Sequence, residues 1–341
     1  MKVAIIGCGN VSRGHIRAWQ RHPETEVAML CDVSEELARE RRDELELSGD
    51  IPITTRYQDA LERDDIDIVD ICTPSHLHAE QIIAALQAGK HMVTEKPTGH
   101  TLEECRELRY HRLQHPEPKV AVAYSLRYYP VNVEVKRLVD EGAIEEVFAG
   151  QFTWNHPHRS RPPSERRSPG YGLLADLGGS YIPSSEACGP THVFDLARYM
   201  MGDPEEVFAY RKRYGVTAVA VFEGGGACTM VAGRSPAEGL RNPTVVCLQG
   251  TKGSIHTVMD QQGEYTGVIA DADGERAIEA GSDTGHGDHT RTQNIVGAIL
   301  RDEPLIAPLE EGIATSEFLH AIWDSYTLGI RVPVHRAGKT G

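Results

Sequence analysis

The stretch that decides the fold is KVAIIGCGNVS, residues 2–12. The run up to Gly7 is short, continuously apolar and rich in β-branched residues, which is typical of a strand buried on both faces. Gly7 and Gly9 follow it directly, and a helical stretch runs from Val11 to about Arg21. The order of strand, glycine turn and helix predicts the start of a dinucleotide-binding unit.

Beyond that stretch, strand-like and helical patterns alternate over residues 1–125. Apolar runs typical of buried strands lie at 27–32, around Ile53, and at 66–74, 91–97 and 119–125. Helical patterns lie at 34–47, 57–63, 75–88 and 102–113, and Ser75 is expected to cap the third of these. This alternation predicts an α/β fold whose N-terminal domain is a doubly wound parallel sheet, a Rossmann domain.

The pattern changes after Arg127, and residues 126–341 are expected to form a second domain. A helix at 131–141 and a strand at 146–155 precede a region, 205–280, of short strands separated by glycine-rich turns. The turn at 249–254 is typical of a hairpin. Helices at 287–301 and 309–329 close the chain. The pattern predicts an α+β domain with a mostly antiparallel sheet.

The glycine turn is the candidate cofactor site. Glycines at 7 and 9 allow the backbone to approach a pyrophosphate at the helix N-terminus, although Ser12 stands where the usual fingerprint has a third glycine. Asp32 closes the second strand 20 residues beyond Ser12, where a carboxylate would bind the adenosine ribose and repel a 2′-phosphate. NAD is therefore favoured over NADP. The residues expected to bind the cofactor here are Gly7, Gly9, Asn10, Val11 and Asp32.

Composition limits the function classes. The 341 residues carry a formal net charge of −15, so nucleic-acid and membrane-surface partners are not expected. The longest apolar runs fall short of the roughly 20 residues that a membrane-spanning helix needs. Seven cysteines without a CxxC pair indicate a reducing compartment, so a cytoplasmic location is expected.

Four segments resemble the Gfo/Idh/MocA oxidoreductases, the superfamily of glucose–fructose oxidoreductase and inositol dehydrogenase. They are IIGCGNVSRGH, CTPSHLHAEQIIAALQAGKHMVTEKP (residues 72–97), SLRYYPVNVEVKRLVDEGAI and GPTHVFDLARYMMG. The resemblance implies a Rossmann domain, an open-sheet domain that often forms dimers or tetramers, and a sugar, polyol or related substrate. By matching position, it also implies that the nicotinamide end of the cofactor is surrounded by Thr73, Pro74, His78, Glu95 and Lys96.

Two residues are expected to carry the proton chemistry, Lys96 at the end of a strand and His192 at the start of a helix. The family's usual pattern has an aspartate four residues before this histidine. In this chain Asp176 precedes His192 by 16 residues, so about 12 residues are inserted between them. Asp176 is the expected third catalytic residue, and Glu186 or Asp195 are alternatives.

Four further residues are candidates for contact with the substrate. Arg127 and Tyr128 are expected to line the crevice, although packing is an alternative role for both. Trp154 is expected to form either a substrate wall or core. Arg159 belongs to a basic loop suited to a carboxylate or phosphate, for which solvation or a subunit contact is the alternative. No metal is predicted, because the pairs His156/His158 and His286/His289 have no matching third ligand.

The sequence therefore favours an NAD(H)-dependent oxidoreductase that transfers a hydride to or from a carbinol or carbonyl carbon of a sugar or polyol. A homodimer or homotetramer is expected. Two other functions are compatible with the same residues. One is an enzyme that retains NAD and oxidises its substrate only transiently, as a glycosidase-like relative would. The other is a non-catalytic nicotinamide sensor.

Overall fold

The computed structural model describes residues 1–158, 191–212, 215–238, 244–260, 263–281 and 287–334. The chain divides into two compact units. The first comprises Met1–Tyr128 and Asp283–Ile313, and the second comprises Tyr129–Ser282 and Ala314–Gly341. No helix among the described residues is both long enough and apolar enough to cross a membrane.

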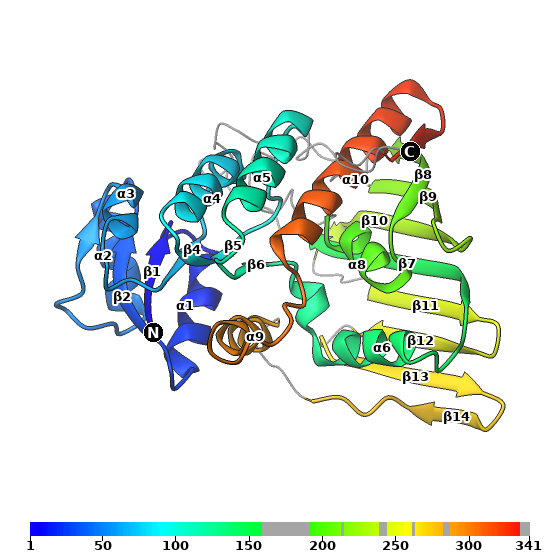
Figure 1. The fold of residues 1–341 in the computed structure, drawn as a ribbon. Helices are drawn as coiled ribbons and strands as arrows, with labels where there is room; N and C mark the ends of the chain where they lie inside the picture. The colour runs from blue at the N-terminus through cyan, green and yellow to red at the C-terminus, as the bar shows by residue number, and fades with distance from the viewer. Residues whose placement is uncertain (159–190, 213–214, 239–243, 261–262, 282–286, 335–341) are drawn as a thin grey trace. The chain divides into compact units, whose positions relative to one another are not determined.

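The first unit is a six-stranded parallel sheet in the order β3-β2-β1-β4-β5-β6 (Figure 1). Its order reverses between β1 and β4, where doubly wound sheets of this kind bind dinucleotides. The strands are β1 (Lys2–Ile6), β2 (Glu26–Cys31), β3 (Ile53–Thr54), β4 (Ile68–Ile71), β5 (His91–Thr94) and β6 (Val120–Val122). The helices are α1 (Ser12–Arg21), α2 (Glu35–Glu44), α3 (Tyr57–Leu61), α4 (His78–Gln87), α5 (Leu102–Gln114) and α9 (Asp288–Arg301).

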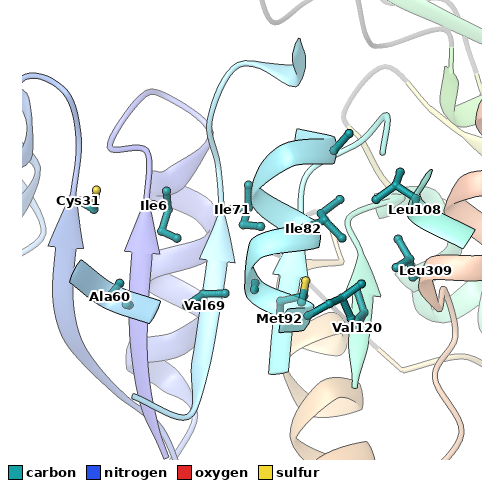
Figure 2. Close-up of a cluster of buried hydrophobic side chains, with 14 of the residues drawn as sticks. Ile6, Cys31, Ala60, Val69, Ile71, Ile82, Met92, Leu108, Val120 and Leu309 are labelled. Atoms are coloured by element: carbon teal, nitrogen blue, oxygen red, sulfur yellow. The ribbon is translucent and has the colours of Figure 1, made fainter. Parts of the chain in front are cut away.

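Alternate residues of each strand enter two separate hydrophobic cores, one on each face of this sheet. On one face, Ile6, Val69 and Met92 pack against α3, α4 and α5, as Figure 2 shows. On the other face, Ile5 and neighbouring strand residues pack against α1, α2 and α9. Both faces are therefore covered by helices, and the predicted doubly wound sheet is confirmed.

Residues 283–313 return to the first unit, a feature that the sequence pattern does not indicate. Helix 287–301 was expected to close the C-terminal domain. In the structure, Ile295 and Val296 of α9 belong to the core beneath α1, and Leu309 and Ile313 belong to the core beneath α4 and α5. The first unit gains the apolar surface that completes both cores by recruiting this late segment.

The second unit is built on a nine-stranded sheet in the order β14-β13-β12-β11-β7-β10-β9-β8-β15. Among the strands that the structure describes here, only β7 and β10 pair in parallel, so the predicted mostly antiparallel sheet is confirmed. Helices α6 and α8 pack on it. The strands are β7 (Val147–His158), β8 (Pro204–Lys212), β9 (Gly215–Phe222), β10 (Ala227–Glu238), β11 (Thr244–Gly250), β12 (Gly253–Met259), β13 (Tyr265–Asp271), β14 (Gly274–Ala277) and β15 (Val332–Pro333). Its helices are α6 (Pro130–Asp140) and α8 (Thr191–Met201), and α10 (Leu309–Leu328) begins in the first unit and continues into the second.

One local expectation is wrong. Ser75 was expected to cap the helix that follows β4, but a short 3-10 turn, Ser75–Leu77, comes first and α4 begins at His78. No side chain caps α4. The Ser75 hydroxyl lies 2.7 Å from His100 Nε2 instead, so it links two loops at the carboxyl edge of the sheet.

Candidate cofactor and active site

The turn after β1 requires glycine at position 7. Gly7 has a φ of +96°, a conformation that strains residues with a side chain. A Cβ there would lie 2.7 Å from the Cys72 carbonyl carbon and oxygen and 2.8 Å from the Thr73 nitrogen. At Gly9, by contrast, a Cβ would meet nothing within 4 Å. The loop is therefore closed toward β4 and open on its other side, as pyrophosphate approach requires.

The N-terminus of α1 is suited to an anion. The N-cap residue, Val11, has no side chain that accepts a hydrogen bond from the first backbone N–H groups of the helix. Ser12, which replaces the third glycine of the fingerprint, is buried and donates its hydroxyl to the Gly9 carbonyl at 2.7 Å. Ser12 therefore closes the turn with a side-chain hydrogen bond that glycine could not make. The loop and helix fit a dinucleotide.

Asp32 lies at the end of β2 with both carboxylate oxygens held by backbone donors. Cys8 N donates to Oδ2 at 2.8 Å and Ser34 N donates to Oδ1 at 2.9 Å. Ser34, and not Asp32, caps α2 by accepting from Leu37 N. A carboxylate fixed in this way beside the glycine loop has the placement expected of a ribose ligand.

Arg41, on α2, contacts the glycine loop, and the sequence pattern did not indicate it. Its buried guanidinium donates to the Cys8 carbonyl at 3.1 Å and to the Gly9 carbonyl at 3.3 Å, and it pairs with Glu44. It lies in the charged stretch ELARERRDE, where nothing in the local pattern separates a buried arginine from an exposed one. Arg41 therefore holds two carbonyls of the glycine loop in place.

Replacing Arg41 with methionine should weaken NAD binding by about tenfold, the equivalent of one charge-assisted hydrogen bond of about 1.5 kcal/mol. Titration of NADH fluorescence measures the Kd. Arg39→Met is the matched control, because Arg39 lies on the same helix in an exposed pair with Glu35. An unchanged Kd in a folded Arg41→Met protein would contradict this role.

The Thr73-Pro74 turn and the Glu95-Lys96-Pro97 segment are tied together by His78. Its Nδ1 lies 2.7 Å from the Pro97 carbonyl oxygen and its Nε2 lies 2.9 Å from the Thr73 carbonyl oxygen. His78 is buried, and burial lowers its pKa. Both ring nitrogens thus face backbone carbonyls, and His78 contributes to the expected cofactor site by joining its two loops. Thr73 donates its hydroxyl to Gln81 Oε1 at 2.6 Å.

Lys96 and Glu95 follow β5 directly and are largely buried. Their side chains are 11% and 14% exposed, and Lys96 Nζ lies 3.9 Å from Glu95 Oε2. Glu95 Oε2 also accepts from the Lys96 backbone nitrogen at 3.2 Å. Burial raises the pKa of Glu95, but the hydrogen bond from His15 and the charge of Lys96 outweigh it and hold that pKa well below its usual value. The pair therefore presents an ammonium and a carboxylate at the carboxyl edge of the sheet.

His15, Asp70 and Cys72 bring potential ligand atoms to within 4.8 Å of one another, as in a metal site. Burial raises the pKa of the Cys72 thiol to about 12, so the thiol stays protonated and is a poor ligand. His15 Nδ1 lies 2.9 Å from Asp70 Oδ1 and 3.3 Å from Cys72 Sγ. These three groups are engaged with one another inside the first unit.

In the second unit, the structure brings Trp154 and His192 together. Their ring centroids are 6.1 Å apart, with Trp154 on β7 and His192 in the first turn of α8. Asp195 is buried and accepts a hydrogen bond from the Thr315 hydroxyl at 2.9 Å. Asp176, Glu186 and Arg159 lie outside the described residues, and their roles stay predictions.

Arg127 and Tyr128 are buried in the first unit. Arg127 donates to Glu311 Oε2 at 3.1 Å and to the Ile306 carbonyl at 3.4 Å, which ties the end of the first segment to the returning one. Tyr128 packs beside Gly287, where an added Cβ would lie 2.9 Å from the Tyr128 Cβ. These contacts favour the packing role that the sequence left open for both residues.

Comparison with known proteins identifies both parts of the chain. Residues 1–123 match a family described as an oxidoreductase family with an NAD-binding Rossmann fold, and residues 132–256 match the GFO/IDH/MocA C-terminal domain. Levoglucosan dehydrogenase in complex with NADH and levoglucosan has the same fold, with a TM-score of 0.83 and 24% identity over 98% of this chain and 100% of that one.

Several curated relatives share part of the sequence. Levoglucosan dehydrogenase of Pseudarthrobacter phenanthrenivorans is 30% identical over 219 residues, which are 60% of this chain and 52% of that protein. D-apiose dehydrogenase of Paraburkholderia graminis is 27% identical over 82% of this chain and 72% of that protein. A glycosyl hydrolase family 109 protein of Streptomyces coelicolor is 36% identical over 32% of this chain and 24% of that protein. The matched region thus spans about half the length of the first relative. With both domains matched, the chain belongs to the Gfo/Idh/MocA family of NAD-binding oxidoreductases.

Proposed function

We propose that this protein is an NAD-dependent dehydrogenase or reductase that acts on a CH–OH group of a sugar, polyol or sugar derivative. The observation that carries the proposal is the position of Lys96, which follows β5 at the carboxyl edge of the parallel sheet with the ionised Glu95 beside it. Doubly wound sheets bind their ligands at this edge. The relatives named for levoglucosan and D-apiose support a carbohydrate substrate.

Oxidation of a carbinol needs a group that takes the hydroxyl proton and a group that stabilises the developing alkoxide. When bound, NAD supplies the hydride acceptor. Lys96 is proposed to stabilise the alkoxide through its ammonium group, and His192 is proposed to take the proton. Asp176 is proposed to support His192. The alternative residue Asp195 is less suited to that role, because its carboxylate accepts from Thr315 in the interior of the second unit.

The wall of the substrate site is proposed to include Trp154 and Arg159. The proximity of the Trp154 ring to His192 supports this role for Trp154, since an aromatic face commonly packs against a sugar ring beside the catalytic base. Arg159 is proposed to bind an acidic group of the substrate through its bidentate donors.

The second unit is also proposed to form the contact between copies in a homodimer or homotetramer. One face of its sheet presents two rows of paired residues with no charged carboxylate, lysine or arginine. The rows are Phe208, Val219, Thr229, Gln151, Cys247, His256 and Val268, and Tyr210, Thr217, Val231, Thr153, Val245, Val258 and Thr266. Phe208, Tyr210 and Val219 are exposed, and an exposed apolar area of this extent is typical of an interface.

A cytoplasmic location is proposed from the cysteines. The six described cysteines are free thiols, and five of them are buried. Free thiols persist in reducing compartments.

NADH formation, followed by absorbance with NAD and a panel of sugars, inositols and sugar acids, tests the proposed activity. We expect turnover with at least one carbohydrate and one NADH released for each substrate oxidised. Tight NAD binding without turnover across the panel would contradict a dehydrogenase and favour the sensor function.

The match to a glycosyl hydrolase family 109 protein favours one second candidate, an enzyme that retains NAD and oxidises its substrate only transiently. Such an enzyme would cleave a glycoside without net release of NADH. Nitrophenyl glycosides in the same assay separate the two: nitrophenol release with constant NADH absorbance indicates the second candidate.

A further inference from the structure

A carboxylate lies in the interior of the parallel sheet, on β4. Asp70 has no exposed surface, and removing an ion from water costs several kcal/mol unless other groups compensate. Two side chains of α1 provide that compensation. Trp19 Nε1 donates to Asp70 Oδ2 at 2.6 Å, and His15 Nδ1 lies 2.9 Å from Oδ1 and 3.0 Å from Oδ2.

The second ring nitrogen of His15 faces another carboxylate. His15 Nε2 lies 3.2 Å from Glu95 Oε1, so the buried ring stands between the acids of β4 and of the segment after β5. A neutral imidazole can donate from only one nitrogen, whereas an imidazolium donates from both. Burial and the charge of Arg291 lower the pKa of His15, but the Asp70 carboxylate outweighs them and the net pKa lies well above its usual value. The raised pKa and the two facing carboxylates both favour an imidazolium.

Each oxygen of the Glu95 carboxylate therefore has its own partner. Its Oε1 faces His15, and its Oε2 accepts from Lys96 N and lies 3.9 Å from Lys96 Nζ. That separation is longer than the 2.7–2.9 Å of a direct ammonium–carboxylate hydrogen bond. The carboxylate thus contacts His15 and the Lys96 backbone but stops short of full contact with the lysine ammonium.

We propose that His15 is a positioning residue for Lys96: anchored by Asp70, it holds the Glu95 carboxylate in place and prevents it from closing onto the lysine ammonium. The inference rests on the proposed function, in which Lys96 stabilises the alkoxide. Without the imidazolium, Glu95 rotates toward Lys96 and draws its ammonium away from the substrate oxygen. The loss of His15 is therefore expected to lower kcat more than NAD affinity, because the glycine loop and Asp32 lie outside this group of side chains.

Other groups also face the imidazolium. Arg291 of α9 is buried, pairs with Asp288 at 2.8 Å and acts on His15, Asp70 and Glu95 through its charge. Cys72 lies 3.3 Å from His15 Nδ1. Among the described contacts, Arg291 acts on Glu95 through its charge and makes no hydrogen bond to it. The hydrogen bond from another side chain that orients Glu95 therefore comes from His15.

A double-mutant cycle with His15→Gln and Glu95→Gln in the NADH assay tests the proposal. We expect His15→Gln to lower kcat by about 100-fold, the cost of a small misplacement at a catalytic centre, with the Kd for NAD nearly unchanged. In the Glu95→Gln background the same change should have little further effect, because the carboxylate through which His15 acts is gone. Full kcat in His15→Gln, or additive losses in the double variant, would overturn the proposal.

Trp19→Phe is the matched control. It removes the other donor to the Asp70 carboxylate but touches neither Glu95 nor Lys96. Loss of kcat equal to that of His15→Gln would show that general destabilisation is responsible, against the proposal. If His15→Gln does not fold, Glu95→Asp tests the same link, since it keeps the charge but shortens the reach to His15. Glu95→Asp is expected to lose kcat and keep NAD affinity, and unchanged kcat would overturn the proposal.

The nitrogen NMR spectrum of the His15 ring separates failure of this inference from failure of the proposed function. The full-length protein should show protons on both ring nitrogens at pH 7, whether or not it turns over any sugar. A doubly protonated ring with no dehydrogenase activity would disprove the proposed function and leave the charged link intact. A neutral ring in an active enzyme would overturn the inference alone.

Discussion

Replacing Lys96 with alanine should lower kcat by about 10²- to 10³-fold, the range that the loss of one donor to a developing oxyanion costs. The reason is the place of the side chain, which is nearly buried at the carboxyl edge of the sheet next to an ionised glutamate. Alanine removes the ammonium that would stabilise the alkoxide and leaves the Glu95 carboxylate with His15 as its neighbouring basic side chain. The assay is NADH formation with the best carbohydrate from the panel.

Lys96→Arg is the control that separates the presence of a positive charge from its position. Arginine keeps the positive charge beside Glu95 but spreads it over a planar guanidinium group in place of a compact ammonium. We expect it to retain substrate affinity and to recover only part of kcat. NADH titration should show a smaller change in Kd than in kcat for both variants, since the glycine loop and Asp32 are untouched. Wild-type kcat in Lys96→Ala would remove Lys96 from the mechanism.

Gly7→Ala should destabilise the first unit by about 2–5 kcal/mol, the sum of a left-handed backbone penalty and overpacking. Its φ is +96°, and an added Cβ would lie 2.7 Å from backbone atoms of Cys72, which cannot move without breaking the pairing of β1 and β4. Urea unfolding, monitored by tryptophan fluorescence, measures the loss.

Gly9→Ala provides the contrast on the same loop. A Cβ at position 9 meets no atom within 4 Å, so the stability change should stay within about 1 kcal/mol, the cost of an ordinary glycine replacement. NAD affinity should fall nonetheless, because the added carbon occupies the open side of the loop that the pyrophosphate approaches. Equal loss of stability in the two variants would contradict the assignment of the closed and open sides.

The sequence predicted the architecture because local pattern and global fold agree in this chain. Continuous β-branched runs alternate with helices over residues 1–125, and that pattern is compatible with few folds other than a parallel sheet. The hairpin turn at 249–254 is confirmed by the pairing of Gly250 with Gly253. The return of α9 was missed because an amphipathic helix does not specify which apolar surface it will cover.

The geometry of the glycine loop was predictable because it is tied to the backbone conformation. Asp32 and the two glycines of the loop lie where the fingerprint places them. Arg41 and His15 were missed because their roles depend on partners far away in the sequence. One signal could have identified the second of these: Asp70 is a charged residue within a strand that must be buried on both faces, so it requires a buried cationic or hydrogen-bonding partner.

The two-segment construction of the first unit has a consequence for how the protein is made. Synthesis on the ribosome proceeds from the N-terminus, and the nascent chain emerges with β1 to β6 long before α9. Until residue 313 has been added, both cores lack their last helical residues and Asp70 lacks the charge of Arg291. The cofactor domain can therefore be completed only after strands β7 to β14 of the second unit have been translated.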